Sequence, residues 1–468
     1  MRRTGRIIKI LSFILPLLLA LVSCASVQTM NKQYKEMDDL LIKRDFERAS
    51  AIISEAKEDE LYKEKDRVLY YLDMGMLNFF NQAYTESIEN LTAAEYAIEE
   101  LYTRSVGKGI ASVLLNDNAL DYFGEDYEDI YLNIFKALSF VHMNNFESAM
   151  VELRRVNLKL SMLEDRYKQY IDEYNNSGEA EAQLQPLESR FHNDVLARYL
   201  SMLLYREDSD YDGARIDGNF IDDAFAQQTQ LYQFAKPQLP ELEYNGRSFL
   251  NFVVFTGRSP AKLARTIFID SGNSIVYLTY KGEDDAYVDR LIGFHTIIMP
   301  GVKAGFHFKF ELPYLSRRGS DISSISVLVD GNEVGQLNLT ENMELIAEET
   351  FKLKQPLIVG KTVARTVTKG IVKELSKSAV NEAAGGGIGG LLAGLAMDIA
   401  VDATENADTR LSQFFPAFAY TGEFEIPSGE HEIELIYYSG RKEVFRDYKG
   451  IIDVKSDSLN LIQSFVFQ

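Results

Sequence analysis

The sequence predicts an α+β fold in which a helical front half precedes a β-rich back half. From about Asn31 to about Gln233, apolar residues recur at three- and four-residue spacing with few Gly or Pro, as in amphipathic helices. After Pro237 and Pro240, short β-branched and aromatic runs alternate with turn residues, as in strands. Because 468 residues are too many for one hydrophobic core, we expect two domains or more.

The composition is that of a folded, acidic protein. Hydrophobic residues make up 46% and charged residues 25% of the chain, which argues against wholesale disorder. The net charge is −21, and no basic stripe interrupts it, so we expect no nucleic-acid partner. With one cysteine, the chain forms neither an intramolecular disulfide nor a cysteine-based metal site.

Residues 1–23 have the features of a secretory signal peptide. Four basic residues are followed by the uncharged stretch Ile10–Val22. As a helix, these 13 residues would span about 20 Å, short of the ~30 Å hydrocarbon core of a bilayer. We therefore expect an export signal rather than a spanning anchor. Its removal takes away four positive charges and lowers the net charge from −21 to −25.

The cysteine lies directly after this stretch. Leu21-Val22-Ser23-Cys24 resembles the lipobox of bacterial lipoproteins. The resemblance implies that the Cys24 sulfur carries diacylglycerol, and that Cys24 is cleaved from Ser23 and acylated, as with palmitate, on its new amino group. Several acyl chains anchor a protein stably. The alternative is an ordinary signal peptide with an incidental cysteine. Ala25 replaces the Asp of an inner-membrane retention signal, which favours the outer membrane, facing the periplasm, in a cell with two membranes.

A short phrase recurs in the helical half, residues 24–236. Each copy places an aromatic residue three positions before a small one: Phe46 and Ala49, Tyr84 and Ser87, Phe146 and Ala149, Tyr211 and Ala214. The phrase resembles the turn and second-helix start of a tetratricopeptide repeat. That resemblance implies stacked helix pairs forming a solenoid whose concave face holds a peptide or protein. The aromatic spacings are 38, 62 and 65 residues rather than about 34. The repeats are therefore degenerate or separated by inserted helices, such as Leu160–Tyr174; the alternative is an irregular helical bundle.

Residues 241–468 predict a β-sandwich-like domain of roughly 8 to 10 strands. Asp330-Gly331-Asn332 is expected to join two strands of a hairpin, and Pro427-Ser428-Gly429 another pair. The expected strands cover residues 248–256, 266–269, 275–280, 295–298, 305–312, 325–329, 334–339, 417–426, 431–438, 443–448 and 460–467.

Residues 359–408 interrupt the strands as a helical, glycine-rich insertion. A helix with a cationic bias, 363–383, precedes an uncharged run, 383–397, in which Gly386, Gly390 and Gly394 would line one helix face. The 15 uncharged residues would span about 22 Å, too short to cross a bilayer. We expect a hairpin buried against the sheet; contact with a membrane surface or with a second copy is the alternative.

Three phrases, at residues 124–133, 146–155 and 407–410, together resemble a family of bacterial lipoproteins of unassigned activity. The family has repeat-like helices at the front and a β domain at the back. The resemblance implies no known chemistry.

Motifs for catalysis and cofactors are absent from the sequence or lack their context. The histidines are scattered without ligand spacing, no GxSxG elbow occurs, and Gly385, Gly387 and Gly390 follow a helix instead of a strand. Gly360-Lys361-Thr362 matches only the end of a P-loop. We expect no enzyme activity and no cofactor beyond the acyl lipid on Cys24.

One acidic motif is a candidate calcium site. Asp208, Asp210 and Asp212, followed by Gly213, match the opening of an EF-hand loop, but Asn219 replaces the bidentate Glu at its twelfth position. The alternative is a solvated turn in which Asp210 or Asp212 caps the next helix.

These observations predict a membrane-anchored envelope lipoprotein that acts as a protein–protein interaction scaffold through its helices, with an envelope protein as partner. The alternative is a carrier or structural lipoprotein that engages lipid or cell-wall glycan.

Overall fold

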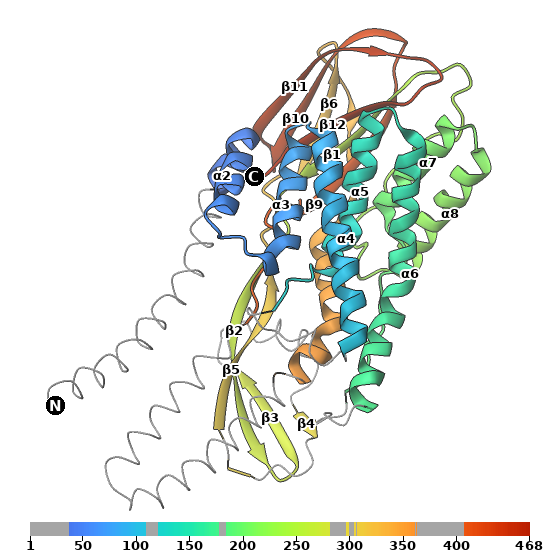
Figure 1. Cartoon of the computed structure of the whole chain (residues 1–468). Helices are drawn as coiled ribbons and strands as arrows, with labels where there is room; N and C mark the ends of the chain where they lie inside the picture. Colours follow the sequence, from blue (N-terminus) through green and yellow to red (C-terminus); the bar gives the residue numbers. More distant parts are fainter. Residues whose placement is uncertain are drawn as a thin grey trace, which may run out of the picture.

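The structure is a computed structural model, and it describes residues 37–468 except 109–119, 177–183, 281–295, 299–303, 306, 361 and 363–406. Helices occupy the front of the chain and sheets the back, so the predicted α+β class is confirmed. Figure 1 shows the helices side by side along the sheets. The expected signal peptide, Cys24 and the glycine-rich run lie outside the described residues.

The helical part consists of successive helices, each packed on its neighbours in sequence. The bounds are 37–42, α2 Phe46–Glu58, the short 3-10 helix η1 Glu64–Asp66, α3 Arg67–Phe80, α4 Tyr84–Lys108, α5 Asp126–His142, α6 Phe146–Asn176, α7 Val195–Glu207 and α8 Tyr211–Gln227. A further helix covers residues 343–360. Leu160–Tyr174 is not a separate inserted helix: it continues α6, because no Gly or Pro interrupts the helical pattern between Phe146 and Asn176.

The recurring phrase forms the same turn four times. The residue two positions before each aromatic has a positive φ: 59° at Arg44, 60° at Gln82, 55° at Asn144 and 59° at Ser209. The next backbone N–H donates to the carbonyl five residues earlier, at 2.8–2.9 Å, in the manner of a Schellman ending. The small residues of the phrase, Ala49, Ser87, Ala149 and Ala214, are at most 1% exposed. Each phrase thus begins the second helix of a pair.

In the residues that the structure describes, three sheets follow, each with four strands. One has the order β12-β1-β9-β8, with β1 Phe249–Thr256, β8 Asn338–Asn342, β9 Phe418–Glu425 and β12 Asn460–Val466. A second has the order β11-β10-β6-β7, with β6 Ser324–Val329, β7 Asn332–Gln336, β10 Gly429–Ser439 and β11 Lys442–Val454. The third has the order β4-β3-β2-β5, with β2 Ala261–Gly272, β3 Ile275–Tyr280, β4 Thr296–Ile298 and β5 His307–Ser316. We call them the central, outer and projecting sheets; the last extends from one end of the body in Figure 1.

The predicted hairpin at Asp330-Gly331 is present, with both residues at positive φ, but its second strand ends early. The expected strand 334–339 is split: β7 pairs with β6, whereas β8 crosses to the central sheet and pairs with β9. The side chains fit the change of partner, since Leu337 is buried between the two sheets while Thr340 bonds to Thr421 of β9 at 2.6 Å.

Both faces of the central sheet are covered. In β1, Leu250, Phe252 and Val254 face the outer sheet, and the alternate residues Val253 and Phe255 face the helices. Every residue of β1 is buried, which explains its almost continuous apolar run.

Aromatic rings fill the space between the helices and the central sheet. Phe79 of α3 and Phe135 of α5 lie 5.0 Å apart between ring centroids, and they reach Phe465 of β12 and Phe255 of β1 at 5.6 and 5.1 Å. The helices and the central sheet therefore share one core. The expected boundary at 236–241 falls in the connection between α8 and β1.

Candidate functional site

The first turn of α5 carries buried acidic side chains. Glu125, Asp126, Glu128 and Asp129 are 3%, 3%, 0% and 8% exposed. The turn forms a capping box, in which the Glu128 carboxylate accepts from the backbone N–H of Glu125 at 2.7 Å. Acidic side chains suit a helix N-terminus, but buried carboxylates still require partners. Those partners come from β2, the helix 343–360, α6 and the segment before β9, and we call the assembly the α5 acidic cluster.

Two lysines hold Glu125. The Nζ atom of Lys262 in β2 lies 2.6 Å from its carboxylate, and Lys354 of the helix 343–360 contacts the same group. Burial opposes ionisation of Glu125, but the two lysines outweigh it and lower the pKa of this carboxyl. Glu125 therefore ties α5 to the projecting sheet and to the helix 343–360.

The segment that precedes β9 contributes an arginine. Arg410 lies 2.8 Å from Asp66, at the start of α3, and 2.7 Å from Asp408. Its guanidinium also lies over the ring of Tyr122, 5.4 Å from the centroid. These contacts hold the chain directly after the insertion. Lys354 holds the chain directly before the insertion, at the same end of the helices.

Glu128 carries the least compensated charge of the cluster. Its carboxylate accepts from the Tyr122 hydroxyl at 2.6 Å and from the Ser412 backbone N–H at 2.7 Å. In the described part of the chain, no lysine or arginine nitrogen lies within 4.0 Å of it. Burial raises its pKa to about 7 despite these donors.

A second buried ionic group joins α4, α5 and α6, and we call it the α4–α6 ion cluster. Lys136 of α5, 2% exposed, lies 2.8 Å from Glu95 of α4 and 3.0 Å from Glu152 of α6. Lys159 and Arg155 of α6 each lie 2.9 Å from Glu95. Burial opposes ionisation of Glu95, but Lys159 and Lys136 lower its pKa to about 2.

The three phrases that resemble the lipoprotein family meet in these two clusters. Residues 124–133 and 407–410 contribute to the α5 acidic cluster, and 133, 152 and 155 to the α4–α6 ion cluster. The charged groups that the phrases contribute to the two clusters are paired, so packing of the fold explains these residues.

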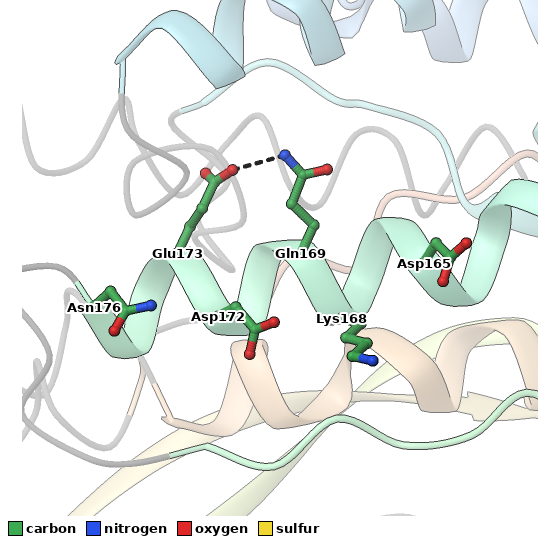
Figure 2. Close-up of a pocket in the computed structure, with 6 residues that line it drawn as sticks. All are labelled: Asp165, Lys168, Gln169, Asp172, Glu173 and Asn176. Atoms are coloured by element: carbon green, nitrogen blue, oxygen red, sulfur yellow. Dashed lines mark hydrogen bonds between the residues drawn. The ribbon is translucent and has the colours of Figure 1, made fainter.

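The hollows that we find do not reach these clusters. Figure 2 shows a shallow polar depression along α6, whose lining side chains all come from that one helix; the Gln169 amide donates to Glu173 at 2.8 Å. A cavity of about 10 Å³, lined by apolar residues such as Leu138, Leu200 and Leu461, lies between α5, α6, α7 and β12. It is at the lower limit for a single water molecule, so it cannot enclose a substrate, and the depression on α6 is open to solvent along one helix.

The candidate calcium residues lie on the turn between α7 and α8. Asp208 ends α7, Asp210 caps α8 by accepting from the Gly213 N–H at 3.0 Å, and Asp212 pairs with Arg215 at 3.1 Å. No three acidic, histidine or cysteine side chains are placed to hold a metal within the residues that the structure describes.

Replacing Asp210 with alanine is expected to lower the free energy of unfolding by about 1 kcal/mol, because the cap of α8 is lost. The loss should be the same with and without millimolar calcium in denaturant titrations. Heat on titrating calcium into the wild-type protein, absent in this variant, would favour the calcium site instead.

One of the histidines and the glycine of the partial P-loop match have packing roles. His142 donates to or accepts from Gln463 at 2.5 Å and stacks on Tyr84, with ring centroids 4.6 Å apart. A Cβ at Gly360 would lie 2.4 Å from a Leu184 methyl carbon, so this glycine permits close packing of the helix 343–360.

An exposed apolar surface lies on the outside of the helices. Tyr96 of α4 is 60% exposed, and Val151, Leu158 and Met162 of α6 are 44%, 58% and 53% exposed. The three α6 residues are seven and four positions apart, so they share one helix face. Arg155, on the same face, bonds to Glu95 next to Tyr96 and brings the two helices together. We call these four residues the outer apolar patch.

Sequence reasoning missed the residues that converge on α5. Lys262, Lys354 and Arg410 are far apart in the chain, and nothing local predicts that they meet. One signal was available: Lys136 stands within the apolar run of a helix that is hydrophobic on every side, and such a helix is buried, so its charge needs partners.

Across the described residues, no helix has both the length and the apolar character needed to cross a bilayer. No family model matches the chain, and no curated protein or solved structure is significantly similar to it. The likeness to bacterial lipoproteins of unassigned activity therefore stays a prediction that the quoted phrases and the Cys24 sequence carry.

Proposed function

We propose that the protein is a lipid-anchored envelope scaffold that binds a protein partner through the outer faces of tetratricopeptide-like helix pairs. Cys24 supplies the anchor in this proposal. The four equivalent turns, each followed by a second helix with a buried small residue, support the repeat interpretation. The acidic body and the buried charge clusters, which neither of the two hollows reaches, favour binding over chemistry.

The observation that carries the proposal is the difference in burial between the two helices of each pair. The first helices pack inside the protein: every residue of α5 from Asp126 to Ser139 is buried. In α7, Arg206 is buried and bonds to Glu423 of the central sheet at 2.6 Å. The face that would hold a peptide in an open solenoid is filled by this sheet. The second helices α4 and α6 instead present the outer apolar patch to solvent.

A partner of the outer apolar patch is expected to crosslink at Leu158. A photoreactive amino acid at position 158, in the full chain and in intact envelopes, should give a discrete crosslinked band. The same amino acid at Lys168, exposed on the same helix ten residues further, is the matched control and should give none. Met162→Glu, which places a charge one turn from Leu158 at an exposed site, should remove the band without unfolding the protein.

Equal crosslinking at 158 and 168, or a band that survives Met162→Glu, would contradict the proposed surface. Repeating the experiment with Cys24→Ser separates the two parts of the proposal: a band that depends on Cys24 requires membrane placement, whereas a band that does not requires only the patch.

A further inference from the structure

Two buried carboxyl groups meet where α7 packs on the central sheet. Asp194 caps α7, with its Oδ1 accepting from the Ala197 N–H at 2.6 Å. Glu341 of β8 accepts from the N–H of Val195, the residue after Asp194, at 3.2 Å and from the Tyr232 hydroxyl at 3.0 Å. Both acidic residues are 0% exposed. They belong neither to the α5 acidic cluster nor to the outer apolar patch.

The groups around this pair do not neutralise it. Tyr131 of α5 faces Asp194, and Tyr232 follows α8; both are neutral hydroxyl donors, and burial raises their pKa further. The closest cation is Arg198, one turn along α7, but its guanidinium bonds to Asp217 of α8 at 2.6 Å. In the described part of the chain, neither carboxyl has a lysine, arginine or histidine nitrogen within 4.0 Å.

Two adjacent carboxylates in a dry interface repel each other and lose their hydration, so the pair is stable only when it retains a proton. Burial raises the pKa of Asp194 to about 6. For Glu341, burial and the neighbouring Asp194 raise the pKa well above its usual value. The two groups titrate as one unit, above the pH range in which ordinary carboxyl groups titrate.

We propose that Asp194 and Glu341 form a proton-dependent clasp that holds the first turn of α7 on β8 and weakens when both carboxyl groups are ionised. The clasp joins two parts of the fold that have different neighbours. α7 belongs to the inner helices, and β8 leads directly into the helix 343–360, which holds Glu125 through Lys354. A rise in the pH of the compartment would thereby weaken the attachment of the helix 343–360 to α7.

The sign follows from the raised pKa values. An opened clasp exposes carboxyls with ordinary pKa values near 4, whereas the closed clasp binds protons more tightly. Closing is therefore most favourable below about pH 4, and this advantage is lost as the pH rises through the raised values. One proton bound by the closed form alone changes the opening equilibrium about tenfold per pH unit.

Hydrogen exchange of the full-length protein in detergent tests the clasp. After correction for intrinsic rates, protection of amides in segments 194–200 and 338–345 should fall at least tenfold between pH 5 and pH 8.5. Glu341→Gln keeps an acceptor for the Val195 N–H but removes the charge, so its protection should vary little over this range. Glu430→Gln, at an exposed position in β10, is the control and should behave as the wild type.

Because exchange is measured segment by segment, it separates the clasp from Glu128, which titrates in the same range but lies at the first turn of α5. Should Glu341→Gln fail to fold, Asp194→Asn gives the same test, because Asn also caps helices well. Protection that is independent of pH in the wild type, or a dependence that persists in the folded variant, would overturn the proposal.

Discussion

Replacing Cys24 with serine is expected to release the protein from the membrane. Serine has no thiol to accept diacylglycerol, so neither the thioether nor the later acylation can form, and two or more acyl chains are lost together. Since each buried methylene contributes about 0.8 kcal/mol to membrane binding, the shift in partitioning is effectively complete. Labelled palmitate should be incorporated into the wild-type protein only, and the variant should leave the membrane fraction.

A matched control separates the anchor from the rest of the leader. Ser23→Ala changes the residue next to Cys24 but keeps a small side chain before the thiol, so labelling and membrane fractionation should remain. If Cys24→Ser still fractionates with membranes and still takes up palmitate, the lipoprotein interpretation is wrong. If it loses palmitate but stays in the membrane, the leader itself is the anchor, and the proposed scaffold would need another attachment.

Local patterns predicted the local structure well. The turn phrase located the start of α2, α4, α6 and α8, because an aromatic residue three positions before a small one is a short-range signal for a turn and a helix start. The two prolines after α8 likewise marked the change from helices to strands. The prediction of a separate inserted helix at 160–174 was wrong. The irregular spacing of the phrases suggested an insertion, whereas a 31-residue helix explains this spacing equally well.

Long-range pairing lay beyond sequence reasoning. β1 and β12 are parallel neighbours although about 200 residues separate them, and their apolar patterns are satisfied by many other partners. The charge clusters were missed for the same reason, because their residues also come from distant parts of the chain. Lys262 and Lys354 each look like ordinary solvated lysines in the sequence, and only the fold brings them to Glu125. A third case is Glu341, which lies just beyond the expected strand 334–339 but is fully buried beside Asp194.

The largest effect on stability is expected from Lys136. Lys136→Met keeps the length of the side chain but leaves Glu95 and Glu152 without the ammonium group that lies 2.8 and 3.0 Å away. Breaking a buried ion pair from one side costs about 3–5 kcal/mol, because the remaining charge stays desolvated. We expect the lower end of this range, because Lys159 and Arg155 remain 2.9 Å from Glu95. Denaturant titrations at pH 7.5 should show this loss in the free energy of unfolding, while Lys168→Met, exposed on α6, should change it by less than about 0.5 kcal/mol.

The pH dependence of this loss tests its electrostatic cause. The pKa of Glu95 is about 2 in the wild type because Lys159 and Lys136 overcome the effect of burial, so Glu95 supports the fold at every pH above its ordinary value near 4.5. Without Lys136 its pKa must rise, and protonation then relieves the buried charge as the pH falls. The destabilisation by Lys136→Met should therefore be smaller at pH 5 than at pH 8, and adding Glu152→Gln should restore part of it. A loss that is equal at both pH values, and unchanged in the double variant, would assign Lys136 a packing role, with its aliphatic stem rather than its charge holding α5 between α4 and α6.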